Sequence, residues 1–200
     1  MFRFSRRHAL IAALALAAAA PAAAAPGVAA PGDMSLGKAS APIKVVEYAS
    51  LTCPHCATYN AEVISVLKSR YIDTGQVQFT LKELLTPPQT VAAAGFLMAR
   101  CAGPDKYFKV VDDVFRSQSR WRAGGIRQVL LQIAMANGLT EPQFEACLKD
   151  EAQLDALEAR IRKVVEEDGI ESTPTIFVNG RKVEGHTLAD LEAAIAAARK

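Results

Sequence analysis

The sequence of 200 residues predicts an α/β fold that an all-helical segment interrupts. Three observations support this fold class. A strand–helix–strand pattern covers residues 43–87, a succession of helical patterns covers residues 88–168, and a hairpin followed by a helix covers residues 169–200. Strands that a helix connects run parallel in one sheet. The sequence therefore predicts one sheet domain in two parts, with a helical insertion between them.

The first part begins with a strand. Residues 43–49 are mostly β-branched or apolar, which favours a strand that is buried on both faces. A helix follows from about Pro54, because apolar side chains recur there at helical spacing, and it ends near Gly75. Residues 76–81 alternate in polarity as a second strand. We expect these two strands to be parallel neighbours.

The insertion contains three apolar stripes at helical spacing. They are Phe108, Val111 and Phe115, then Ile126, Leu130 and Ile133, then Leu154, Leu157, Ile161 and Val164. Asn137-Gly138 ends one helix, and Thr140 with Gln143 forms a capping box that begins the next. We therefore expect the insertion to be helical throughout.

The last part of the chain predicts a hairpin and a helix. Residues 175–178 and 181–184 form the two strands, and Asn179-Gly180 suits the tight turn between them. Thr187 caps the final helix.

The N-terminal segment has the features of an export signal. A start with three arginines precedes an unbroken apolar run over residues 9–20, and alanine-rich sites follow. The run is short for a bilayer span. We expect residues 1–25 to be a cleaved signal peptide, residues 26–42 to be a loosely ordered linker, and the protein to be exported to the periplasm. Ser5-Arg6-Arg7 leaves the general secretory and twin-arginine routes open.

The charge balance argues against nucleic-acid binding. The chain has 23 basic and 21 acidic residues, a net charge of +2. Loss of the signal with its three arginines leaves 20 − 21 = −1. A protein without a basic excess lacks the electrostatic footprint of a nucleic-acid partner.

Cys53-Pro54-His55-Cys56 carries the predicted chemistry. Two thiols at this spacing can open and close as a disulfide, and the free N–H groups and dipole of a helix start favour the thiolate. Cys53 is the expected nucleophile and Cys56 the resolving thiol. Pro54 suits the first helical position, and His55 can donate to the Cys53 thiolate or stabilise its charge. A zinc half-site is the alternative, but no second motif completes it, so we expect neither metal nor cofactor.

Two segments resemble the DsbA-type exported thiol:disulfide oxidoreductases of the thioredoxin superfamily. They are Val46-Glu47-Tyr48-Ala49-Ser50-Leu51-Thr52-Cys53-Pro54-His55-Cys56 and Ser172-Thr173-Pro174-Thr175-Ile176-Phe177-Val178-Asn179-Gly180. With the helices between them, the resemblance covers roughly residues 43–199. It implies a thioredoxin-like fold with an inserted all-helical subdomain.

The resemblance also implies roles for residues outside the dithiol. Glu47 would lie beneath the active site and assist proton transfer at Cys56; the alternative is a strand-end glutamate that reaches solvent. Independently of the resemblance, we expect Lys82 to be the counterion of Glu47. Pro174 would be cis and face the dithiol, and the backbone of Thr173 would pair with an extended client segment. The alternative for Pro174 is an ordinary proline at a strand start.

All four cysteines lie in the exported part, where an even number favours disulfides. A short-range pair of Cys53 and Cys56 leaves Cys101 with Cys147. We expect a structural disulfide between these two, and two buried free thiols are the alternative. Whether this disulfide tunes the redox poise stays open.

Three functions fit the sequence. The first is a monomeric dithiol oxidase that introduces disulfides into unfolded or partly folded client proteins with cysteines, and that a DsbB-type quinone-linked membrane partner re-oxidises, as the resemblance implies. The second is a disulfide reductase or isomerase of the same fold, which Thr173 favours, because many strongly oxidising relatives carry an aliphatic residue there. The third is a copper- or zinc-binding module that uses the thiolates.

Overall fold

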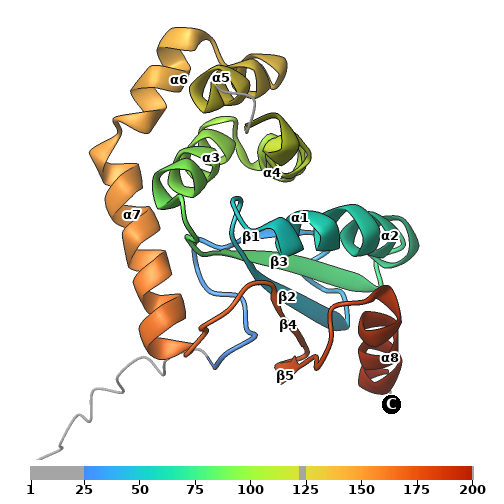
Figure 1. Cartoon of the computed structure of the whole chain (residues 1–200). Coiled ribbons are helices and arrows are strands. Elements are labelled where there is room, and N and C mark those ends of the chain that lie inside the picture. The colour runs from blue at the N-terminus through green and yellow to red at the C-terminus, as the bar shows by residue number, and fades with distance from the viewer. Residues whose placement is uncertain (1–24, 122–124, 200) are drawn as a thin grey trace, which may run out of the picture.

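The computed structural model describes residues 25–121 and 125–199. Five strands of this part form one mixed sheet in the order β1-β3-β2-β4-β5 (Figure 1). They are β1 (Met34–Leu36), β2 (Ile43–Ala49), β3 (Val77–Glu83), β4 (Thr175–Val178) and β5 (Arg181–Lys182). The central strands β2 and β3 are parallel, and every other pairing is antiparallel. The predicted parallel pair is confirmed.

The helices also follow the predicted order. One continuous run contains α1 (Pro54–Tyr59), η1 (Asn60–Ile64), α2 (Ser65–Leu67) and η2 (Lys68–Ile72); α3 (Gln89–Cys101), α4 (Pro104–Trp121), α5 (Ile126–Ala136), α6 (Glu141–Leu148), α7 (Glu151–Arg162) and η3 (Lys163–Glu167) lie between β3 and β4; and α8 (Leu188–Ala198) follows the hairpin. In Figure 1, α3 to α6 gather at one end of the molecule, and α7 leads back from them to the sheet. Thr140 forms the predicted capping box, and Thr187 caps α8 as predicted, in its case also through a capping box.

The two faces of the sheet bury separate cores because side chains alternate along a strand. Val45 of β2 points into the large core that the α1–η2 run, α8 and the insertion share. Val46 and Tyr48 of the same strand point to the other face, into a smaller core with Val164 and Ile170 at the end of the α7–η3 helix. Consecutive residues of β2 therefore serve different environments.

The prediction that residues 26–42 form a loose linker is wrong. Within them β1 pairs with the edge of β3, and Ser35 Oγ lies 2.7 Å from Thr80 Oγ1. The Gly27 N–H donates to the Tyr48 hydroxyl at 2.8 Å. A strand of three residues is too short for a periodic pattern, so composition alone suggested a linker. The predicted signal peptide lies outside the described residues, apart from residue 25.

Among the described residues, no helix combines the length and the apolar character that a bilayer crossing requires.

Candidate active site

The dithiol lies where the chain leaves β2 and enters α1. Cys53 is the N-cap residue, with φ −77° and ψ 119°, and Pro54 occupies the first turn. An extended N-cap residue turns its side chain back toward the free N–H groups of the helix. The Cys56 N–H accordingly donates to Cys53 Sγ at 3.4 Å. Cys53 retains 6% of its surface exposed, whereas Cys56 is fully buried.

The loop before β4 forms the other wall of the site. The Thr173–Pro174 bond is cis, and Cys53 Sγ lies 3.4 Å from the Thr173 carbonyl oxygen, to which the thiol donates. These two segments are 120 residues apart in the sequence. Their contact places the backbone of Thr173 next to the sulfur atom of the expected nucleophile.

The two thiols differ in acidity. The hydrogen bond with the Cys56 thiol is the main cause that lowers the pKa of Cys53 to about 5. Burial raises this pKa, whereas the Thr173 side chain and the backbone N–H groups of Cys56 and His55 lower it further. Burial raises the pKa of Cys56, and the Cys53 hydrogen bond and the charge of Glu47 raise it further. At neutral pH the arrangement therefore favours a thiolate at Cys53 beside a neutral thiol at Cys56.

Glu47 of β2 is 1% exposed, and it lies near enough to Cys53 and Cys56 for its charge to interact with both thiols. The alternative of a glutamate that reaches solvent is therefore wrong. Burial raises the pKa of Glu47 to about 8, with a smaller contribution from the charge of Cys53. Among the described residues, no group hydrogen-bonds to its Oε1 atom. An unpaired buried carboxyl is favoured in its neutral form, so Glu47 can hold a proton near neutral pH.

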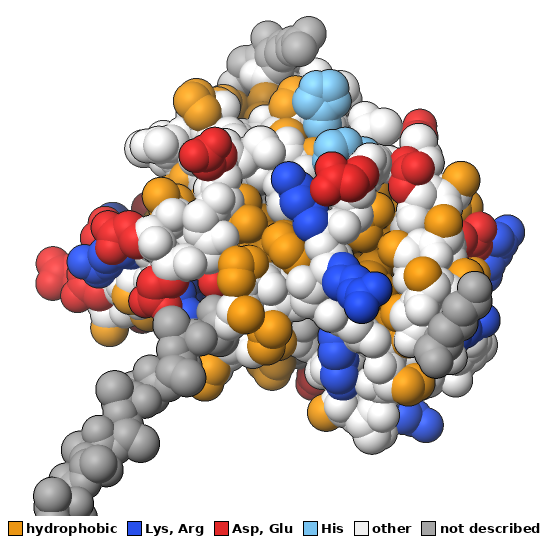
Figure 2. All heavy atoms as spheres, turned by 90° about the horizontal axis from the view of Figure 1, so that it is seen from below, with side chains coloured by type: hydrophobic (Ala, Val, Ile, Leu, Met, Phe, Trp, Pro, Cys, Tyr) orange, Lys and Arg blue, Asp and Glu red, His pale blue; other side chains and the backbone are white. Residues whose placement is uncertain are grey.

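A cleft of about 330 Å³ lies beside the nucleophile. Its lining includes His55, Tyr59, Glu62, Thr173, Pro174 and His186. Figure 2 shows the histidines of the described chain side by side on one face. The His55 imidazole is exposed, and within the described residues it makes no hydrogen bond. The contribution of His55 to the low pKa of Cys53 comes from its backbone N–H group, and it is smaller than that of Cys56.

Comparison with known proteins identifies the family. A family model described as thioredoxin matches residues 29–197. The chain belongs to the thioredoxin family. A Rickettsia bellii (strain RML369-C) protein named as a protein-disulfide oxidoreductase is 33% identical over 165 residues, which cover 82% of this chain and 63% of that protein. The chain thus spans about three fifths of the length of the rickettsial relatives that it matches.

Solved structures support the same assignment. Wolbachia pipientis alpha-DsbA1 matches with a TM-score of 0.75 and 25% identity, over 86% of this chain and 95% of that one. BdbD from Bacillus subtilis has the same TM-score at 21% identity, over 84% and 92% of the two chains, and this likeness concerns the fold. The resemblance to DsbA-type proteins and the thioredoxin-like fold with a helical insertion are confirmed.

The prediction that Lys82 is the counterion of Glu47 is wrong. In the sheet of this thioredoxin fold, Glu47 is paired with Leu81, and Lys82 is paired with Tyr48. Residues that are adjacent along a strand point to opposite faces, so Lys82 points away from the dithiol. Its Nζ atom lies 2.8 Å from the Asp168 carboxylate.

The lysine belongs to a separate buried network on the other sheet face. Lys82 also lies 3.8 Å from Asp33, and the Tyr48 hydroxyl donates to Asp168 at 2.8 Å. The network joins the N-terminal segment, two strands and the end of η3. Neither aspartate is identifiable from the sequence, because nothing in the local pattern separates these residues from exposed acidic residues.

Several polar residues around the dithiol loop are likewise not identifiable from the sequence. The Thr52 hydroxyl donates to the Thr86 carbonyl oxygen at 2.7 Å, and the Thr86 N–H donates to Ser50 Oγ at 2.9 Å. The Gln118 side chain of α4 donates to two carbonyl groups of the same loop. Such residues carry no motif, so only the folded structure identifies them.

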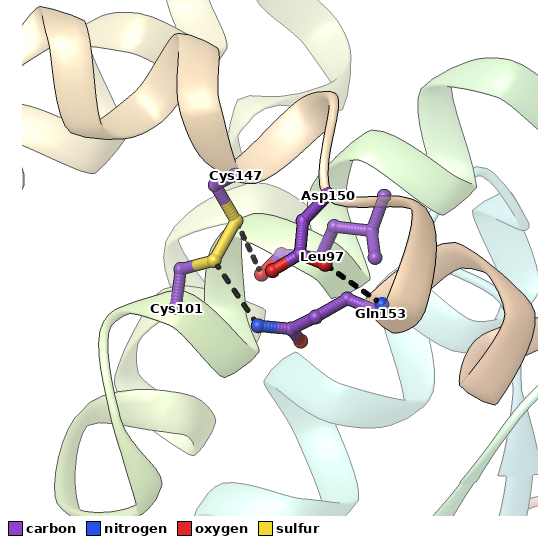
Figure 3. The surroundings of a disulfide bond; sticks show 5 residues. All are labelled: Leu97, Cys101, Cys147, Asp150 and Gln153. Carbon is purple, nitrogen blue, oxygen red and sulfur yellow. Dashed lines mark hydrogen bonds between the residues drawn. A yellow bond between two sulfur atoms is a disulfide. The ribbon is translucent and has the colours of Figure 1, made fainter.

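A disulfide joins Cys101 at the end of α3 to Cys147 in α6, the pairing that the cysteine count predicts (Figure 3). Gln153 Nε2 donates to Cys101 Sγ at 3.7 Å, and the Gln153 N–H donates to the Asp150 carboxylate that caps α7. The disulfide therefore joins α3 to α6, and the hydrogen bond from Gln153 connects α7 to the same place. Within the described residues, no group of three or more His, Cys, Asp or Glu side chains is arranged to hold a metal ion.

Proposed function

We propose that this protein is a thiol:disulfide oxidoreductase that oxidises cysteine-containing client proteins through Cys53 and Cys56. The observation that carries the proposal is the unequal acidity of the two thiols, a pKa of about 5 at Cys53 and a raised pKa at Cys56. A thiolate that is stable in the reduced protein is a good leaving group and makes the oxidised form a strong oxidant.

The reaction begins with the Cys53–Cys56 disulfide. A client thiolate attacks Cys53 Sγ, the bond between Cys53 and Cys56 breaks, and Cys56 leaves as a thiolate. Because its pKa is raised, Cys56 takes up a proton, which Glu47 can supply from its protonated carboxyl.

A second client thiolate then attacks the client sulfur atom of the mixed disulfide. The bond to Cys53 breaks, Cys53 leaves as a thiolate, and the client holds a new disulfide. The client is oxidised by two electrons and the protein is reduced by two. The backbone of Thr173 beside Cys53 can pair with the extended client segment during these steps.

The proposal includes export to the periplasm after removal of residues 1–25, activity as a monomer, and re-oxidation by a DsbB-type membrane partner. The N-terminal sequence supports export. The Cys101–Cys147 disulfide supports an oxidising compartment.

Equilibration of the Cys53–Cys56 pair with glutathione tests the direction of electron transfer. We expect a potential well above thioredoxin's about −270 mV, toward DsbA's about −120 mV. Cys56→Ser should attack a disulfide-containing client and hold it as a mixed disulfide on Cys53, because no resolving thiol remains, and Cys53→Ser should not. A Cys101→Ser/Cys147→Ser variant keeps both active thiols and, once its Cys53–Cys56 pair is oxidised, should still oxidise a reduced client. A potential near that of thioredoxin would instead favour the reductase function to which Thr173 points.

A further inference from the structure

Gln118 connects the helical insertion to the loop that carries the nucleophile. Its Nε2 atom donates to the Leu51 carbonyl oxygen at 2.8 Å and to the Cys53 carbonyl oxygen at 3.2 Å. A primary amide has two N–H donors, so one side chain can satisfy both acceptors. Within the described residues, no other side chain hydrogen-bonds to the backbone of residues 51–53.

The position of this contact matters for Cys53. The Cys53 carbonyl oxygen also accepts the first hydrogen bond of α1, from the Ala57 N–H at 3.1 Å. Leu51 is fully buried, so its carbonyl group depends on a protein partner. Without Gln118, the buried Leu51 carbonyl group loses its side-chain partner, and the Cys53 carbonyl group keeps only its hydrogen bond from the Ala57 N–H.

The hydrogen bonds from Gln118 also affect the negative charge of the Cys53 thiolate. The N–H groups of Gln118 present the positive ends of their dipoles to the main chain of the residue whose sulfur atom carries the negative charge. Oriented dipoles of this kind stabilise an anion without any rearrangement. Gln118 contacts the carbonyl oxygen of Cys53 and not its sulfur atom, so its effect passes through the Cys53 backbone.

Trp121 lines the same groove as Gln118, and its fluorescence can be measured. Gln118, Thr52, Pro54 and Trp121 line a groove of about 630 Å³ that shares no residue with the histidine cleft. The chain has one tryptophan. Its fluorescence therefore reports on the environment next to the dithiol loop, where Gln118 acts.

We propose that Gln118 is a positioning residue for Cys53, through which the helical insertion holds the nucleophile against the start of α1 and favours its thiolate. This inference rests on the proposed function, because it concerns the redox chemistry of the same dithiol.

Gln118→Met tests the inference, because methionine keeps the length of the side chain and removes both donors. Gln132→Met is the matched control: the same change on an exposed residue of α5. For Gln118→Met we expect the Cys53 thiolate midpoint, followed by ultraviolet absorbance, to rise by about one pH unit. The equilibrium constant against glutathione should become about tenfold less oxidising, which is about 30 mV for two electrons. The fluorescence of Trp121 is the signal with which this redox equilibrium with glutathione is measured.

Gln118→Glu separates electrostatic positioning from simple packing. Its protonated carboxyl donates one hydrogen bond at low pH, whereas its carboxylate faces two carbonyl groups and a thiolate at higher pH. We expect a near-normal fluorescence spectrum in acid and a Cys53 midpoint above that of Gln118→Met. This variant also provides the test if Gln118→Met does not fold.

The inference is overturned if both Gln118 variants match Gln132→Met in thiolate midpoint and potential, even when they unfold more readily. If the proposed function itself is wrong, the experiments give a different result. In that case the wild-type protein itself shows an ordinary thiol pKa or no exchange with clients, and the comparison of thiolate midpoints between variants still decides the role of Gln118.

Discussion

The low pKa of Cys53 makes the stability of the protein with a free Cys53 depend on pH. The pKa is about 5 in the folded protein, against 9.0 for an ordinary cysteine. A group whose folded pKa is depressed stabilises the fold fully above its unfolded pKa, and this stabilisation disappears as the pH falls through the folded pKa. The contribution of Cys53 should therefore grow from pH 5 to pH 9.

The magnitude follows from the two pKa values. At pH 7 the thiol is about two pH units above its folded pKa and about two below its unfolded one, which corresponds to at most about 2.7 kcal/mol. Cys53 is largely buried, with 6% of its surface exposed. Because solvent at this exposed part screens some of the interactions of the thiolate, we expect about 1–2 kcal/mol.

Two variants isolate this contribution without any reductant. Cys56→Ser keeps a hydroxyl donor where the Cys56 thiol hydrogen-bonds to Cys53, and leaves the Cys101–Cys147 disulfide closed. Cys53→Ser/Cys56→Ser removes the titrating thiol from the same background. We expect urea unfolding to show that the stability difference between them increases by about 1–2 kcal/mol from pH 5 to pH 7. A difference that is constant up to pH 8 would refute the thiolate at Cys53.

Three further changes have defined outcomes. Glu47→Gln should stabilise the fold by about 3 kcal/mol at pH 7 and by less than about 1 kcal/mol at pH 5, because a folded pKa of about 8 against 4.5 makes the stability fall as the pH rises. The same variant should slow the exchange step at Cys56, which stopped-flow fluorescence measures. Lys82→Met should cost about 3–5 kcal/mol in urea unfolding, because Asp168 stays buried without its cation, and Lys82→Met/Asp168→Asn should recover most of the loss. Cys101→Ser/Cys147→Ser removes a cross-link over 46 residues and should cost at most about 4 kcal/mol in the same assay, with the Cys53 thiolate midpoint unchanged if the disulfide is structural only.

Features that depend on neighbouring residues could be predicted from the sequence. The bounds of β2 agree with its apolar run, and the capping boxes at Thr140 and Thr187 join residues three positions apart. The dithiol motif belongs to the same class, because its spacing and its place at a helix start both lie within a few residues of Cys53. Interactions between residues that are close in the sequence determine each of these features.

Contacts that depend on the exact strand register, or on a single side chain without a motif, could not be predicted. The partner of Lys82 is Asp168, 86 residues away, and the choice between Asp168 and Glu47 depends on which face of β3 the lysine occupies. Gln118 meets its acceptors across 65 and 67 residues. An isolated glutamine in a helix has no pattern that points to such a contact.

The separation of the two sheet faces explains how one strand can serve both chemistry and stability. Glu47 faces the dithiol without a cation, so burial keeps its carboxyl protonated near neutral pH and ready to protonate Cys56. Tyr48, the next residue, faces the buried Lys82 network and anchors the N-terminal segment. A lysine directed at Glu47 would stabilise the fold, but it would lower the pKa of the carboxyl and remove the proton that the leaving thiolate requires. The stability that the unpaired carboxyl costs is thus part of the proposed mechanism, and the Glu47→Gln variant should gain stability as it loses rate.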